Sequence, residues 1–326
     1  MSAPLDVRAP MRAVSQTVRA YFAPVNRATN APTVFDPAKD GSFNVDAPPA
    51  PWIALGTIAD FSRSALTEVN ALATGTKGST RLQARRKLSA EIAFEFREWG
   101  KLQMALACGS QQMNLLAEAS GATPRASGST PAAKVVLQAG STASELVVGS
   151  TAVAQFAVGD IVAVDIDYTG QVGFVGSGVS SAYVKSAASV NSDPDYIRRV
   201  TFNVARVAAK TATTLQLDQP LIGGVPDPAA SIQKVIGFVD REGGSFFHEW
   251  SALFVCESQT GGRVIYHYPR LQAATTAAES RDDFAKPFSA WSLQAKFRAL
   301  PTTDANDGEE VLCYRTWIPG STSALY

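Results

Sequence analysis

Residues 85–109 read RRKLSAEIAFEFREWGKLQMALACG, and the first half of this stretch has a period of two. The apolar side chains of Ile92, Phe94 and Phe96 alternate with charged or small ones. Because successive side chains of a strand point to opposite faces, this alternation predicts a strand with one apolar and one charged face.

The second half of the stretch changes to helical spacing after Trp99. Leu102 and Leu106 lie four residues apart, and Gly109 stands where a helix would end in a left-handed residue. The sequence therefore predicts a short helix near 98–108. We expect this helix to cover the apolar face of the preceding strand, since both elements must bury an apolar side.

Two further regions carry strand patterns. PWIALGTIADFSR at 51–63 reads as the first strand of the same core. Near the C-terminal end, WSLQAKFRA at 291–299 alternates, and a turn TTDANDGEE at 302–310 leads into a last strand, VLCYRTWIP, at 311–319.

In pattern and order these stretches resemble the major tail tube proteins of long-tailed, siphovirus-type bacteriophages, over roughly residues 50–120 and 235–326. The resemblance implies a mainly β fold, a tail-tube-like β-sandwich or barrel with one flanking α-helix. It also implies a structural virion protein that self-associates into hexameric rings. The rings would stack into a tube that conducts DNA during genome ejection. Other tail proteins, namely the tape measure, tail terminator and distal tail proteins, would be its partners, with DNA only as transiting cargo.

Other functions remain open at this point. The chain could be a capsid decoration protein or the tube of a contractile device, although by the same resemblance contractile tube subunits are usually smaller. A carbohydrate-binding β module is the third class, and it would need aromatic side chains exposed on one face. The tryptophans instead fall within patterns typical of a core: Trp52, Trp99, Trp250, Trp291 and Trp317.

Residues 1–50 are rich in Ala and Pro, and the repeated prolines exclude long helices and central strands over most of this region. MRAVSQTVRAYF at 11–22 predicts a short helix. Either the segment is a solvated tail, or it is an extended N-terminal arm that lies across neighbouring subunits. Tyr21, Phe22 and Phe35 are too apolar for a solvated tail, which favours the arm.

The middle of the chain differs in composition. SGATPRASGSTP at 120–131 reads as a linker, and residues 130–230 contain short Val-, Ala-, Gly- and Thr-rich strands. We expect a small inserted all-β domain there, between two core segments at 51–125 and 235–326. The alternative is one larger sheet system. Residues 64–87 are expected to form a loop or a loose hairpin between the first two core strands.

The inventory of reactive residues argues against an enzyme. The chain has two histidines, His248 and His267, which are expected in adjacent strands. A zinc site needs more ligands, and Ala252 occupies the position where the HExxH motif would require histidine. We therefore expect no catalytic, cofactor-binding or metal-binding residues, and no cofactor.

Charge and cysteine content point to the same class. Lys+Arg and Asp+Glu both number 29, so there is no basic excess that would hold nucleic acid or an anionic membrane tightly. The three cysteines read as free thiols of a reducing compartment. With no signal peptide and no membrane span apparent, we expect assembly in the host bacterial cytoplasm and a final location in the virion.

Local charge concentrations allow two interpretations. The loop at 64–87 is basic, and the turn at 302–310 is acidic. They are either two solvated loops or complementary surfaces on successive stacked rings, where opposite charges would set register.

Overall fold

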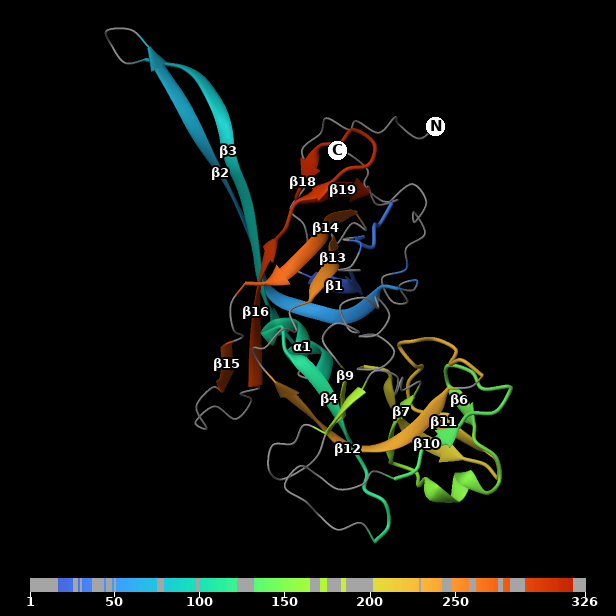
Figure 1. Ribbon diagram of the computed structural model, residues 1–326. Coiled ribbons are helices and arrows are strands. Elements are labelled where there is room, and N and C mark those ends of the chain that lie inside the picture. The colour runs from blue at the N-terminus through green and yellow to red at the C-terminus, as the bar shows by residue number, and fades with distance from the viewer. Residues whose placement is uncertain are drawn as a thin grey trace, which may run out of the picture. The chain divides into compact units, whose positions relative to one another are not determined.

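The computed structural model (Figure 1) divides the chain into two compact units. Unit 1 comprises Met1–Val25, Ala31–Cys108 and His248–Tyr326, and unit 2 comprises Asn26–Asn30 and Gly109–Phe247. The structure describes residues 17–25, 29, 31–36, 44, 49, 51–74, 79–97, 100–121, 132–164, 171–174, 183–185, 202–228, 230–241, 248–257, 262–274, 278–281 and 291–318.

Unit 1 is built on an 8-stranded antiparallel sheet. Across the sheet the strands follow the order β15 (Ala278–Arg281), β16 (Trp291–Ala299), β3 (Ser79–Phe96), β2 (Ile53–Thr74), β1 (Thr17–Pro24), β13 (Glu249–Glu257), β14 (Arg263–Ala273) and β19 (Tyr314–Ile318).

The sheet curls until it meets itself. The first part of β14 pairs with β19, and its last residues pair with β16, so that Leu271 lies opposite Ala299. The strands β16, β3, β2, β1, β13 and β14 therefore form a closed circuit, called the barrel below. The expected mainly β, sandwich- or barrel-like fold with a flanking helix is confirmed.

Aromatic rings fill the inside of the barrel. Phe94 on β3 stacks on Phe297 of β16, with ring centroids 5.7 Å apart and an interplanar angle of 14°. Phe22 on β1 meets Phe254 of β13 at 6.0 Å and 90°. Ile92 and Phe94 are both buried, as the period-two pattern predicts, because alternate residues of β3 face the enclosed side.

Strand β1 lies in the middle of the sheet. It pairs with β13 over its whole length and with β2 on its other side. Phe22 points into the barrel, while Tyr21 joins a second apolar cluster with Phe35 and Trp52 on the opposite face of the sheet. Both faces of this strand are therefore buried.

This position corrects two expectations for the N-terminal region. The helix predicted over 11–22 is wrong for Thr17–Phe22, which is strand, and residues 11–16 lie outside the described residues. The extended arm expected over 1–50 does not hold for Thr17–Pro24 either. A strand buried on both faces has no polar face, so its apolar residues follow no period of two and also fit a helical spacing.

The predicted helix is present as α1 (Lys101–Cys108), and Gly109 after it has a φ of 62°. Its position differs from the expectation. Helix α1 packs mainly against β16 and β14, whereas Phe94 is covered by rings from other strands of the barrel. Because the sheet closes on itself, β3 buries its apolar face without needing the helix.

The segment expected as a loop or loose hairpin is a long regular hairpin. Strands β2 and β3 stay paired from the barrel out to Thr74 opposite Ser79, with β-bulges between Glu68 and Val69 and between Leu72 and Ala73. Figure 1 shows this ribbon extending well beyond the other strands of unit 1. Residues 75–78 at its tip lie outside the described residues.

Unit 2 is a second antiparallel β structure. Its main sheet follows the order β4 (Gln111–Leu116), β12 (Ser231–Arg241), β7 (Ile161–Val164), β10 (Val204–Lys210), β11 (Thr214–Leu217) and β6 (Glu145–Val147), with β5 (Val135–Val136) also on β12. Two smaller elements are the 3-10 helix η1 (Ala152–Gln155) and a ladder of β8 (Gln171–Phe174) with β9 (Tyr183–Lys185).

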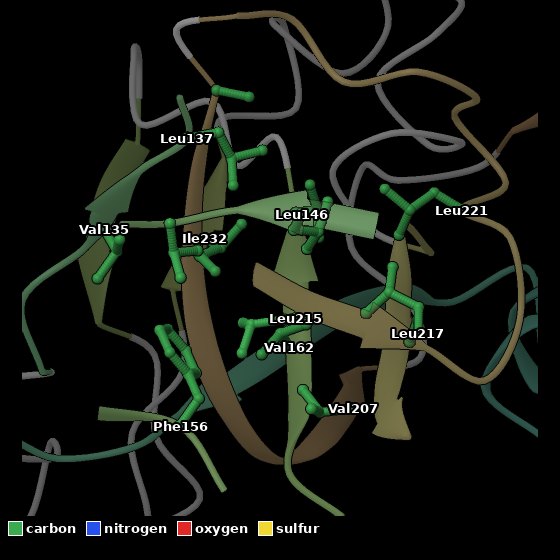
Figure 2. Packing of buried hydrophobic residues seen from close by; sticks show 14 of the residues in the cluster. Val135, Leu137, Leu146, Phe156, Val162, Val207, Leu215, Leu217, Leu221 and Ile232 are labelled. Atoms are coloured by element: carbon green, nitrogen blue, oxygen red, sulfur yellow. The ribbon is translucent and has the colours of Figure 1, made fainter. Parts of the chain in front are cut away.

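The core of unit 2 is mainly aliphatic, with Phe156 among its members, whereas the interior of unit 1 is rich in aromatic rings. Figure 2 shows Leu146, Val162, Val207, Leu215 and Ile232 packed together, each fully buried and each from a different strand. A hydrophobic cluster of its own is what an independently folding unit requires.

The ends of unit 2 lie beside each other. Gln111, at the start of β4, pairs with Arg241, at the end of β12. Unit 2 thus includes β4 and β12, and it extends further than the 130–230 expected for the inserted domain. Most of the linker expected at 120–131 lies outside the described residues.

Candidate assembly surface

The outer part of the β2–β3 ribbon, residues 64–74 and 79–90, is called the hairpin arm below. It exposes aliphatic side chains on both faces: Leu66 is 61% exposed, Leu82 62% and Val69 48%. The ladder places Leu66 and Leu82 on one face, and Val69 and Leu88 on the other. An isolated two-stranded ribbon is marginally stable in water, so this arm is a surface that gains stability when it is covered.

The same arm is positively charged. Arg85, Arg86 and Lys87 are all exposed, and Glu68 pairs opposite Lys87 in the ladder. One carboxylate among these three cations leaves a positive excess. A partner that covers the arm must therefore offer apolar surface and negative charge together.

The acidic turn at 304–310 is an ordered structure. It is closed by the ladder of β17 (Thr302–Thr303) with β18 (Glu310–Val311). The backbone N–H of Gly308 donates to the Asp304 carbonyl at 2.8 Å, and the Asp307 carboxylate accepts the Glu309 N–H at 3.0 Å. Gly308 has a φ of 77°, which a residue with a side chain rarely adopts.

Tyr314 fixes the charge at the start of this turn. Its hydroxyl donates to Asp304 Oδ2 at 2.6 Å, and this bond holds the pKa of the Asp304 carboxyl below its ordinary value. Burial, followed by the hydrogen bond to Asp304, raises the pKa of Tyr314 to about 12. At neutral pH the Asp304 carboxylate is therefore ionised and held on a fixed backbone.

The face of β3 turned away from the barrel interior carries paired charges. Glu91 accepts hydrogen bonds from Lys296 at 2.7 Å and from Arg298 at 2.9 Å, both on β16. Hydrogen bonds to these two cations lower the pKa of the Glu91 carboxyl. Glu95 lies opposite Gln294 on the same face, as the alternation predicts. The alternating Lys296 and Arg298 were visible in the sequence, but their register against Glu91 was not.

The two histidines do not form a joint site. His248 precedes β13, whereas His267 pairs with Leu253 further along the ladder. The His267 ring stacks on Tyr314 with centroids 5.7 Å apart and lies edge-on to Trp52 at 6.1 Å. Burial lowers the pKa of His267 to about 4, so the ring is neutral and structural at ordinary pH.

The remaining candidates for chemistry are dispersed. Cys108, Cys256 and Cys313 are free thiols, as expected, and burial raises the pKa of Cys256 to about 11. In the described part of the chain, no three His, Cys, Asp or Glu side chains come together as metal ligands. None of the helices described there has the length and apolar character to cross a membrane.

Comparison of the chain with protein-family models and with curated proteins gives no match.

Proposed function

We propose that the chain is the tail tube subunit of a siphovirus-type phage, a structural virion protein that polymerises into stacked hexameric rings. The hairpin arm carries this proposal. It exposes Leu66, Val69, Leu82 and Leu88 on a ribbon without a second layer. A monomeric protein gains nothing from such a ribbon, whereas a polymer covers it at every repeat.

Assembly through the arm would be heterologous, because the arm and the surface that receives it are different parts of the chain. Heterologous contacts generate rings where the rotation closes and filaments where it does not. The basic residues of the arm and the acidic turn of a neighbouring copy offer opposite charges for such a contact. Their attraction would set direction and register and would weaken with added salt.

The outward face of β3 and β16 is the candidate channel wall. Where β3 pairs with β16, two acidic residues, Glu91 and Glu95, balance two basic ones, Lys296 and Arg298. Both cations are bound by Glu91. A wall whose cations are already paired attracts phosphate weakly, which suits DNA that must pass without sticking. Tape measure, terminator and distal tail proteins would be the further partners in the virion.

Negative-stain electron microscopy of the purified chain tests this proposal. We expect rings or tubes of uniform diameter. A short-arm variant, in which residues 66–89 are replaced by Asn-Gly, joins Ala65 to Ala90, which are paired in the ladder. It should remain folded by circular dichroism and should stay monomeric.

A matched pair of variants separates the arm from general surface stickiness. Leu66→Ser with Leu82→Ser should abolish assembly. Val136→Ser with Ile236→Ser changes aliphatic residues of unit 2 that are 54% and 61% exposed, and it should leave assembly intact. Wild-type protein that remains monomeric at high concentration, or arm variants that form tubes as well as wild type, would contradict the proposal.

A further inference from the structure

Two arginines, Arg63 and Arg315, lie beside Tyr266 of β14. Arg63, on β2, donates from Nε to the hydroxyl of Tyr268 at 2.6 Å, and its guanidinium carbon lies 5.9 Å from the ring centroid of Tyr266. Both tyrosines belong to β14, which does not pair with β2, so Arg63 reaches across the barrel. Arg315, on β19, lies directly opposite Tyr266 in the ladder and therefore on the same face.

Cys313 shows that the two guanidinium groups share one neighbourhood. Burial raises the pKa of its thiol, while the Tyr268 hydroxyl and the positive charges of Arg63 and Arg315 act in the opposite direction. Both cations thus lie within electrostatic range of one sulfur atom. Tyr268 is fully buried, and burial raises the pKa of its hydroxyl, so the group stays protonated.

This cluster contains two arginines, and none of its described members carries a carboxylate. Among the described residues, neither Arg63 nor Arg315 forms an ion pair with a carboxylate. The carboxylates of Glu249 and Glu257 pair instead with Arg270, at 2.7 Å, and with Arg263, at 3.7 Å. A half-buried cation in a tyrosine-lined site is stabilised by an anion that forms hydrogen bonds with it.

We infer that Arg63 and Arg315, together with the rings of Tyr266 and Tyr268, form a binding site for an oxyanion. Arg63 donates from Nε to Tyr268, and its guanidinium also interacts with the Cys313 thiol. A guanidinium has five N–H groups, so donors remain for the oxygens of a phosphate or a carboxylate. The ligand is either a free inorganic anion or a carboxylate side chain of a second copy, and this inference does not depend on the tube proposal.

Thermal unfolding of the full chain tests the site, with potassium phosphate compared against potassium chloride at equal ionic strength. Phosphate should raise Tm in a saturable way, by about 2–4 °C at ten times its Kd. Arg315→Gln, at an exposed position, should remove most of the phosphate-specific rise. Arg63→Gln and Tyr268→Phe should also reduce it.

Arg206→Gln is the matched control, because Arg206 is an exposed arginine of unit 2. It should retain the full phosphate-specific rise. General salting-out by phosphate would raise the Tm of every variant to the same extent. The difference in the rise of Tm between wild type and a variant therefore reports only binding at the site. If the rise is the same in Arg315→Gln, Arg63→Gln and wild type, the inference is overturned.

Sedimentation velocity distinguishes the two sources of the oxyanion. If a carboxylate of a second copy occupies the site, phosphate should compete and lower self-association of wild type, and Arg315→Gln should associate more weakly. If a free ion is the ligand, phosphate should raise Tm and leave association unchanged. Absence of both effects would overturn the inference.

Discussion

Replacing Phe94 by Ala should remove a ring that connects several strands of the barrel. Phe94 is 3% exposed, and its ring centroid lies 5.6 Å from that of Phe254, 5.7 Å from Phe297 and 6.4 Å from Phe22. Phe→Ala substitutions in cores cost about 3–5 kcal/mol. Aromatic pairs add about 0.5–1.5 kcal/mol each beyond their buried area, so the cost should lie near the upper end.

Urea unfolding followed by tryptophan fluorescence and circular dichroism measures this loss. A domain is stable by only about 5–15 kcal/mol, so Phe94→Ala should bring the unfolding transition of unit 1 close to native conditions. The transition of unit 2 should not move. Glu95→Ala, on the other face of the same strand, is the control and should change stability by less than about 0.5 kcal/mol. A Phe94→Ala loss below about 1 kcal/mol would refute the closed aromatic interior.

Three further outcomes are expected. The pKa of His267, about 4 when folded, lies below its ordinary value, so its stabilising contribution is complete above pH 6.5 and is lost as pH falls towards 4. Wild type should lose about 3 kcal/mol more than His267→Phe over that interval in urea titrations, and equal slopes would contradict the buried neutral ring. Replacing residues 112–240 by Asn-Gly should leave unit 1 folded, with a cooperative thermal unfolding transition of its own, because Gln111 and Arg241 are already paired. An unfolded product would show that unit 1 depends on unit 2. Gly109→Ala should cost about 1–2 kcal/mol by thermal melting, because the φ of 62° is unfavourable for alanine, and an unchanged Tm would place the helix end elsewhere.

The parts of the fold that follow from local pattern were predictable. Strand β3 has one polar and one apolar face, so its period of two is visible in the sequence. Helix α1 is followed by Gly109, whose left-handed conformation is a local requirement. Strand β1 was missed because both of its faces are buried, which removes the polar positions that reveal a strand.

Long-range contacts were not predictable from the pattern. Nothing local to Leu271 or Ala299 indicates that β14 and β16 pair and close the barrel. For residues 64–87 the sequence predicts a loop or a loose hairpin, because Gly75, Gly78 and a Ser/Thr cluster mark its tip. The ladder continues nevertheless, from Ala65 opposite Ala90 to Thr74 opposite Ser79. The Arg63–Tyr268 contact joins residues 205 positions apart and had no sequence signal.

The central position of β1 has a consequence for how the chain folds during synthesis. Strand β1 is synthesised before unit 2, yet one of its two neighbours, β13, is made only after unit 2. Contacts between the first and last thirds, such as Thr33 with Ser251 across 218 positions, give unit 1 a high contact order. Unit 2 lies within one continuous stretch apart from residues 26–30 and can fold while the rest is still being translated. The barrel cannot close until β13 and β16 have been made, and during that interval β1 and β3 hold unpaired strand edges that a chaperone would have to shield.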